Sequence, residues 1–564
     1  MRAGWVVTVL ALTLWLSHAE APLAQDTPVL AAMADELKRS MESLRLADQP
    51  APYFIEYEVE DRAWTRATAR LGALVEDLGG RIRTLRVGVR VGDYAFDSSL
   101  FNAPAGGGVL ELQADGSTSA PLDDDYDAMR RQIWLATDSA YRRAVNLFAR
   151  KSAAFQNRVA SMTVPDFSRE RPVETLLSVP PADAMDRAWS ERARQISAAF
   201  VSVRDIEGSE VSVSSSRGTR YYLNSEGFKV VAPIQIASLR VTADTQAPDG
   251  MALRDAFTLV ETSLQAFPPV QDIAARARQM AERLRAERSA PIGEEYTGPI
   301  LVEGQASAEL VLQSLVPAML ARRPAEFVGR GGGRGGGGGG QLTPFARRIG
   351  LRVLSEPFSV SDTPSLRESD GRPVAGAYVV DEQGVRAKDV ALVERGRLTT
   401  LIAGRAPLPR LLQSSGHTRG GDVQPGVFQM QSSDAVSAAE LKRRYLDLLE
   451  AQEKPFGYII RGLASPNDAP GGGPGTGPMI FQAVKVTPDG REEPVRGLRM
   501  GAVPAGAFRD LLEASRERML YNVRATATDA ISLIVPSLIF EEIDIQQSRD
   551  IIQKPPVVRS PIDN

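Results

Sequence analysis

DEQGV at Asp381–Val385 and VALVERGRL at Val390–Leu398 are the two runs that decide how the second half of this chain folds. The aliphatic run predicts strands over 390–394 and 397–402, because β-branched and aliphatic residues favour strands. Similar patterns predict further strands over 298–302, 353–360, 377–380, 457–460, 479–486 and 530–545, with helices over 306–319, 437–453 and 505–522. Strands therefore dominate after residue 291, and we expect a sheet-rich, barrel- or sandwich-like C-terminal domain over 291–550.

The residues before 291 predict a mixed α/β N-terminal domain over 25–290. Apolar residues recur at three- and four-residue steps over 27–45, which indicates an amphipathic helix, and further helices are predicted over 127–155 and 270–287. Predicted strands cover 54–60, 82–91, 111–113, 210–214, 220–224 and 233–243, with a turn at Arg217-Gly218. The fold class is therefore α+β, and 564 residues are too many for a single core.

The first residues have the pattern of a secretory signal peptide. Arg2 precedes an apolar run from Trp5 to Leu16, and small residues at Ala19 and Ala24 offer two cleavage sites. The apolar run is short for a membrane anchor, although an uncleaved anchor is the alternative. We expect a signal peptide over 1–24 and a mature protein that is exported to a bacterial periplasm, without stable membrane insertion.

The composition narrows the possible chemistry. The chain has no cysteine and two histidines, of which His18 lies in the leader and His417 does not. Zinc sites and hydrolytic nucleophile–base pairs depend mainly on Cys and His, so neither is favoured here. The formal net charge of −4 gives no basic excess for nucleic-acid binding.

Four further segments are glycine-rich, acidic or terminal. The glycine-rich tracts 329–340 and 470–478 are expected to be flexible loops, because the first lacks the Lys-Ser/Thr ending of a phosphate loop. Residues 551–564 are expected to be a tail. The alternating acids Asp123, Asp125 and Asp127 suggest a calcium loop, but Ala128 stands where such a loop needs glycine. We therefore interpret the acids as the start of a helix.

The ordered motifs resemble the TldD/PmbA family, which is named for gyrase modulation and microcin processing. The resemblance covers nearly the whole mature chain and rests on DEQGV, VALVERGRL, and the runs at Leu85–Gly88, Leu122–Arg130, Tyr296–Leu301 and Val535–Glu542. It implies a metallopeptidase-related fold and a dimer. Active members hold zinc with His-Glu-x-x-x-His on a helix after a Gly-Pro strand, and with a later Cys.

The zinc motif is degenerate in this chain. Leu312 stands at the first His, Gln313 at the Glu and Pro317 at the second His, and the later Cys position falls near Ile460-Arg461-Gly462. Leucine and proline side chains have no donor atom for a metal, and glutamine is not a general base. We therefore assign no catalytic residue, no metal ligand and no cofactor. The helical spacing of Leu312 with apolar neighbours predicts that it packs into the core.

His417 lies in the polar, glycine-flanked segment Ser414–Asp422. A Ser-His-Asp triad within one short loop is disfavoured, because triad members normally converge from distant segments. Its expected role is structural, with a contact to a bound ligand as the alternative.

Two functions remain open. The first is an exported, non-catalytic member that binds peptide or unfolded protein, or that pairs with a TldD-type catalytic partner as a homo- or heterodimer. PmbA-type members, which also lack the motif and are thought to act beside a metal-bearing partner, are a precedent. The second is an active peptidase or other hydrolase with an unrecognised site, such as a metal held by carboxylates.

Overall fold

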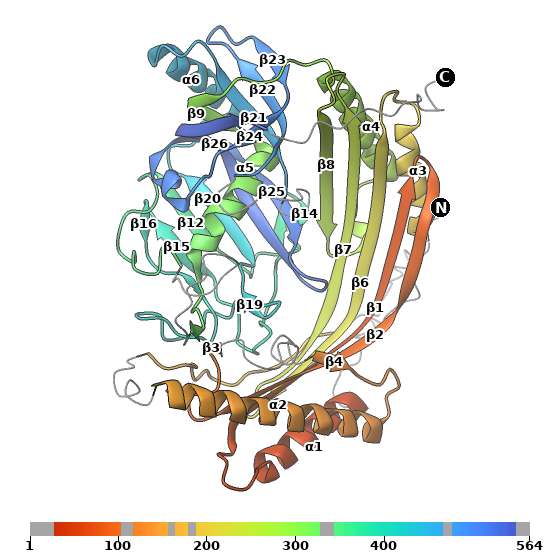
Figure 1. The fold of residues 1–564 in the computed structure, drawn as a ribbon, viewed down its shortest axis with the longest axis vertical. Coiled ribbons are helices and arrows are strands. Elements are labelled where there is room, and N and C mark those ends of the chain that lie inside the picture. The colour runs from red at the N-terminus through yellow and green to blue at the C-terminus, as the bar shows by residue number, and fades with distance from the viewer. Residues whose placement is uncertain are drawn as a thin grey trace, which may run out of the picture.

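The computed structural model describes residues 27–102, 117–155, 164–178, 188–327, 343–465 and 477–548. The expected signal peptide, the strand at 111–113, the tract 329–340, most of 470–478 and the tail 551–564 lie outside these residues. Two large sheets organise the described chain, which confirms the α+β class (Figure 1). The expected boundary at residue 291 falls between the last helix beside the first sheet and the first strand of the second sheet.

The first sheet has the strand order β4-β2-β1-β6-β7-β5. Strand β8 pairs with the same edge of β7 as β5, farther along the strand. Its strands are β1 (Pro52–Arg70), β2 (Ala73–Val91), β4 (Ser117–Ser119), β5 (Glu174–Leu176), β6 (Gly208–Asn224), β7 (Lys229–Gln246) and β8 (Ala252–Glu261). One face is covered by α1 (Pro28–Ser43) and α2 (Tyr126–Phe155) near one end, and by α3 (Ala188–Ser197) and α4 (Val270–Glu287) near the other (Figure 1). The opposite face is turned toward the second half of the chain.

The helices begin where the sequence supplies caps. The Thr27 hydroxyl accepts the Leu30 N–H at 3.2 Å, directly before Pro28 opens α1. Ahead of α2, the Asp125 carboxylate accepts the Ala128 N–H at 2.8 Å. Asp124 pairs with Arg83 at 2.6 Å. The acidic run therefore starts a helix, as predicted.

The turn predicted at Arg217-Gly218 is wrong, because β6 is one continuous strand through both residues. It pairs with β1 from Ala69↔Val211 to Glu56↔Asn224 and with β7 along its other edge. A Cβ at Gly218 would lie 2.0 Å from the Asp61 carbonyl oxygen. Glycine is thus needed here for close approach to β1 and not for chain reversal.

The second sheet has the order β16-β15-β12-β20-β26-β9-β21-β22-β23, with β24 and β25 also on β26. Its strands are β9 (Tyr296–Val302), β12 (Phe358–Asp362), β15 (Val390–Glu394), β16 (Arg397–Leu398), β20 (Val427–Ser432), β21 (Gly457–Leu463), β22 (Ile480–Val486), β23 (Glu492–Val495), β24 (Leu498–Met500), β25 (Leu511–Arg524) and β26 (Ala530–Gln547). Within the described residues this strand path does not close into a barrel, so the sandwich-like form is the one consistent with the structure. The main core of this half contains side chains of β9, β26 and α5 (Gly304–Leu310).

Smaller elements complete the fold. Helix α6 (Ala438–Ala451) covers β9 and β26 through Leu441, Tyr445 and Leu449. Two-residue strands form short pairs between the larger elements: β3 (Phe101–Asn102), β10 (Leu320–Ala321), β11 (Glu326–Phe327), β13 (Glu368–Ser369), β14 (Arg372–Pro373), β17 (Ile402–Ala403), β18 (Thr418–Arg419) and β19 (Asp422–Val423). Among the described helices, none is long and apolar enough to cross a membrane.

Two further predictions in the second half are wrong. The predicted helix over 505–522 is a short 3₁₀ turn, Ala505–Asp510, followed by β25. Strand β25 pairs with the buried β26 from Leu511↔Phe540 to Arg524↔Ala530, and this long-range pairing overrides the local helix preference. The predicted strand over 377–380 contains a single bridge, Val380↔Arg386, because the chain turns there through Asp381 and Gly384.

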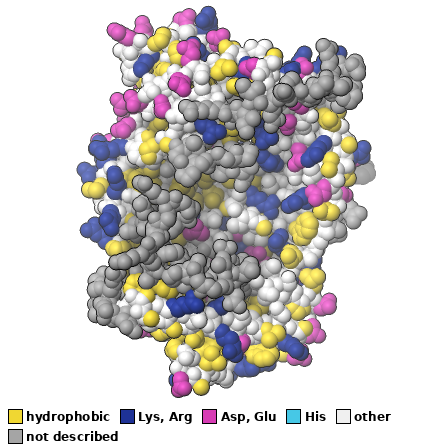
Figure 2. Space-filling view, in the orientation of Figure 1, with side chains coloured by type: hydrophobic (Ala, Val, Ile, Leu, Met, Phe, Trp, Pro, Cys, Tyr) yellow, Lys and Arg dark blue, Asp and Glu magenta, His cyan; other side chains and the backbone are white. Residues whose placement is uncertain are grey.

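Lys and Arg side chains gather between the two sheets on the face shown in Figure 2.

Candidate functional site

The helix that follows β9 changes its winding at the position of the degenerate motif. Helix α5 ends at Leu310, a π-helical turn covers Val311–Leu315, and a 3₁₀ turn covers Val316–Met319. The Val316 N–H donates to the Val311 carbonyl, which is the wider i→i+5 pattern. Such a turn brings residues five apart closer to one face, which is the spacing between Leu312 and Pro317.

None of the three motif positions presents a metal ligand. Leu312 is half-buried and packs against the main core, as predicted. Pro317 is exposed. Gln313 is half-buried and is the only one of the three with a polar side chain.

Gln313 is held in a hydrogen-bond network that the sequence analysis did not identify. Its Nε2 donates to Glu309 Oε2 at 3.0 Å and to the Ala464 carbonyl at 2.9 Å. The Tyr521 hydroxyl donates to Glu309 Oε1 at 2.6 Å, and Glu309 has no solvent exposure. The Gln313 amide therefore connects this helix to the end of β21. Glu309 connects it to β25 through Tyr521. The i, i+4 spacing of Glu309 and Gln313 was the one available signal.

The segment near which the resemblance places the later Cys, Ile460-Arg461-Gly462, also contains a residue with structural ion pairs. Arg461 pairs with Glu303 at 3.0 Å and with Glu492 at 2.9 Å. It therefore ties β21 to the start of α5 and to β23, and its guanidinium supplies no metal ligand.

The residues present do not fit a zinc ion. Leu312 and Pro317 carry no donor atom, and the buried carboxylate of Glu309 is already engaged by Tyr521 and Gln313. Across the described residues, no group of three or more His, Cys, Asp and Glu side chains is arranged to hold a metal. We derive no reaction step through a metal at this position.

His417 is buried, with no solvent exposure, and does not lie in an exposed loop. Its Nε2 lies 2.7 Å from Asp362 Oδ2, and its Nδ1 lies 2.9 Å from the Ser415 carbonyl and therefore donates to it. Tyr378 packs edge-on against the ring. Both ring nitrogens therefore face protein atoms.

The DEQGV run is a hydrogen-bonded turn beside His417. Asp381 accepts the backbone N–H groups of Gln383 and Val385 at 2.9 Å and of Thr418 at 3.0 Å. Burial raises the pKa of Asp381 to about 7, against the lowering effect of these N–H groups. The motif thus positions a turn against the segment that carries His417.

The neighbouring Glu382 belongs to an ionic network that joins the two halves of the chain. Glu382 lies 3.4 Å from Arg86 on β2 and 3.7 Å from Arg220 on β6. Arg220 also pairs with Asp529 at 3.0 Å. Burial raises the pKa of Glu58, which contacts Arg86, to about 7. Two residues of the family-like motifs, Arg86 and Glu382, therefore hold the halves together.

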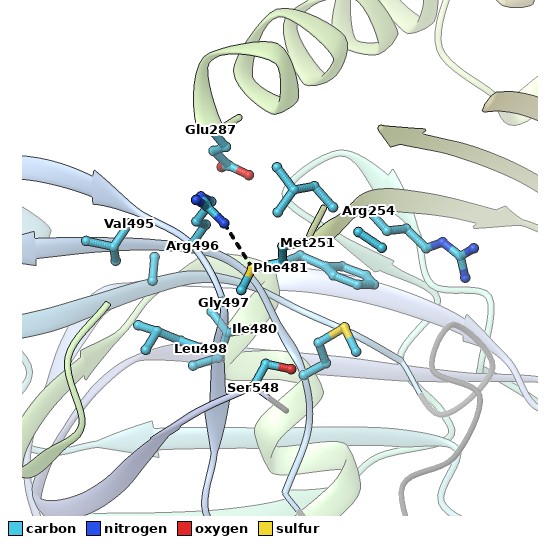
Figure 3. A pocket seen from close by; sticks show the side chains of 14 residues that line it. Met251, Arg254, Glu287, Ile480, Phe481, Val495, Arg496, Gly497, Leu498 and Ser548 are labelled. Atoms are coloured by element: carbon cyan, nitrogen blue, oxygen red, sulfur yellow. Dashed lines mark hydrogen bonds between the residues drawn. The ribbon is translucent and has the colours of Figure 1, made fainter. Parts of the chain in front are cut away.

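A separate pocket lies where β8 and the end of α4 meet β22, β23 and β24 (Figure 3). It has about 480 Å³ of empty space, part of it open to solvent, and its wall includes Met251, Phe481 and Leu498. Arg496 lines it too, but pairs with Asp249 at 2.8 Å. Burial raises the pKa of Glu287, on the same wall, to about 8, and the like charge of Asp255 raises it further. Nothing in the sequence pattern indicated this pocket.

Comparison with known proteins gives one family match. Residues 296–547 match the model of the PmbA/TldA metallopeptidase C-terminal domain. No curated protein matches the chain significantly.

Three solved structures share the fold over most of the chain. A proposed modulator of a DNA gyrase from Thermotoga maritima has a TM-score of 0.57 and 11% identity, covering 87% of this chain and 96% of that one. TldE from Thermococcus kodakarensis has a TM-score of 0.55 and 15% identity, covering 91% and 99%. A proposed modulator of DNA gyrase from Bacteroides thetaiotaomicron has a TM-score of 0.56 and 11% identity, covering 92% and 98%. At these identities the likeness concerns the fold.

Proposed function

Because this chain belongs to the TldD/PmbA family, we propose that it is an exported member that has lost the zinc site and acts without catalysis, binding peptide or unfolded protein. The family match concerns the metallopeptidase C-terminal domain. A shared fold does not by itself imply that the catalytic activity is retained.

The observation that carries the proposal is the Gln313 network. Both hydrogens of one amide nitrogen are used, toward Glu309 and the Ala464 carbonyl. A catalytic glutamate at this position would bring a second carboxylate against Glu309. Glutamine at position 313 therefore fits a structural contact between secondary-structure elements. It does not fit a site that activates water.

A partner subunit is the second part of the proposal. The family resemblance implies a dimer, and members without the motif are thought to act beside a metal-bearing TldD-type subunit. We propose the same arrangement here, as a homodimer or with such a catalytic partner. Size-exclusion chromatography of the mature protein, alone and mixed with a TldD-type protein from the same organism, tests this part.

Export rests on the leader over 1–24. Expression of the full chain in a Gram-negative host, followed by fractionation and N-terminal sequencing, is expected to place a shortened protein in the periplasm. A full-length protein in the cytosol would contradict export and leave the binding proposal to its own test.

The test of the central function measures binding and cleavage in one sample. Fluorescently labelled unfolded casein and a mixed peptide library are incubated with the mature protein. Binding is measured by fluorescence anisotropy, and cleavage is measured by electrophoresis. We expect binding without cleavage. Cleavage that a chelator stops would contradict the proposal and favour a hydrolase with an unrecognised site.

A further inference from the structure

Three arginines converge between the two halves of the chain, and we call them the arginine cluster. Arg62 and Arg66 project from β1, and Arg524 ends β25. Arg524 Nη1 donates to the Ser214 hydroxyl at 2.7 Å, and Arg66 stands opposite Ser214 in the strand register. Arg62 Nη1 donates to the Ser216 hydroxyl at 3.2 Å, two residues along β6.

The cluster has no counter-charge in the described part of the chain. The other hydrogen bonds of Arg524 go to the carbonyls of Thr526 and Ala527. Arg62 Nε is buried without a hydrogen-bond partner. Glu76, a carboxylate on the same face of β2, accepts from the Thr68 hydroxyl and forms no ion pair among the described residues.

Two other arginines on the same sheet face have carboxylate partners. Arg86 pairs with Glu58, and Arg220 pairs with Glu60 at 2.7 Å. In the cluster, by contrast, burial lowers the pKa of Arg524 and the positive charges of Arg62 and Arg66 lower it further. Unpaired like charges brought together in the folded state favour binding of an anion.

The cluster is open to solvent at one end. Arg66 is exposed, and Arg62 and Arg524 are half-buried. An extended ligand can therefore reach the guanidinium groups from the Arg66 end.

Arg62 and Arg66 leave the backbone at separate positions along β1. Arg62 and Arg66 are four residues apart on one strand, which is about 13 Å along its axis, and both lie on the same face. An extended peptide repeats its side chains at the same interval, so acidic residues four apart on one face match both arginines.

We propose that the arginine cluster binds the side-chain carboxylates of an extended acidic peptide segment. This inference rests on the proposed peptide-binding function and adds the class of ligand and its location. Arginine suits the task, because its planar guanidinium pairs with a carboxylate through two parallel hydrogen bonds.

The experiment compares five forms of the mature protein: wild type, Arg66→Gln, Arg66→Lys, the double variant Arg62→Gln/Arg66→Gln, and Arg347→Gln. Arg347 is an exposed arginine outside the cluster and serves as the matched control. Anisotropy is measured with a labelled glutamate-rich dodecapeptide, with its glutamine-rich counterpart as the neutral probe. Inorganic phosphate is added as a competitor, and thermal melts check that each variant folds.

We expect the acidic peptide to bind wild type and Arg347→Gln equally. The affinity for the acidic peptide should fall roughly tenfold for each cluster arginine removed. The loss of one charge-assisted hydrogen bond weakens binding by about this factor. The neutral peptide should bind weakly to every form. Restoring charge with Arg66→Lys should recover part of the lost affinity.

Equal affinity of all five proteins for the acidic peptide would overturn the inference. The proposed function would survive that result if the mixed peptide library still binds, and would fail with it if no peptide binds. Phosphate binding that depends on Arg66, without binding of the acidic peptide, would overturn the peptide assignment.

Discussion

Replacing Gln313 by glutamate restores the residue that active relatives are expected to carry, and we predict that it destabilises this protein. The amide nitrogen of Gln313 lies 3.0 Å from Glu309 Oε2 and 2.9 Å from the Ala464 carbonyl. Gln313→Glu replaces this donor with an oxygen that faces two acceptors. Glu309 is fully buried, so water does not relieve the conflict.

The magnitude follows from the geometry. Two unit charges about 3 Å apart repel by roughly 5 kcal/mol at an effective dielectric constant of 20. The pair avoids this by retaining one proton, and holding a carboxyl with an ordinary pKa near 4.3 protonated at pH 7 costs about 4 kcal/mol. The lost hydrogen bond to Ala464 adds about 1 kcal/mol. We therefore expect a loss of roughly 4–5 kcal/mol at pH 7 and about 1 kcal/mol near pH 4.

The assay is urea unfolding followed by far-ultraviolet circular dichroism at both pH values. Gln313→Met is the matched control, because it removes both hydrogen bonds without adding charge. Its loss should be about 2 kcal/mol and nearly the same at the two pH values. If Gln313→Glu is within 1 kcal/mol of wild type at pH 7, the reasoning about this joint is wrong.

Three further predictions use the same unfolding assay. Burial raises the pKa of Glu287 to about 8, so this carboxyl favours the folded state at low pH and its contribution is lost as pH rises from about 4.5 to about 8. Glu287→Gln should flatten the pH dependence in that window, by an amount on the order of 4 kcal/mol. His417→Ala should cost about 3–5 kcal/mol, because the buried Asp362 would lose its histidine partner and keep the hydrogen bond from the Gly426 N–H. It should leave peptide binding unchanged. Burial raises the pKa of Asp529, but Arg220 and a second arginine outweigh it and hold the pKa below its usual range. Asp529→Asn should therefore destabilise the junction by about 3–5 kcal/mol, and an unchanged unfolding midpoint would contradict this role.

The sequence predicted the elements whose signals are local. The helices over 27–45, 127–155 and 270–287 have apolar or helix-favouring patterns, and the structure has α1, α2 and α4 there. The packing of Leu312 was predicted from its helical spacing for the same reason.

The failures occur where distant segments decide the local structure. Residues 505–522 favour a helix by composition, but the buried strand β26 recruits them as β25. Gly218 has the signal of a turn, yet its lack of a side chain serves the approach of β1.

The candidate site was predictable only in part, for a related reason. The loss of metal donors at Leu312 and Pro317 follows from residue type alone. The partners that give Gln313 and His417 their roles are Ala464, 151 residues from Gln313, and Asp362, 55 residues from His417. No local pattern connects residues so far apart. The arginine cluster likewise joins β1 to the end of β25.

The most direct test of the central claim is elemental metal analysis of the purified mature protein, run beside a peptidase assay on unfolded casein. We expect no stoichiometric metal and no cleavage, with or without added zinc. Stoichiometric zinc, together with cleavage that a chelator abolishes, would contradict it.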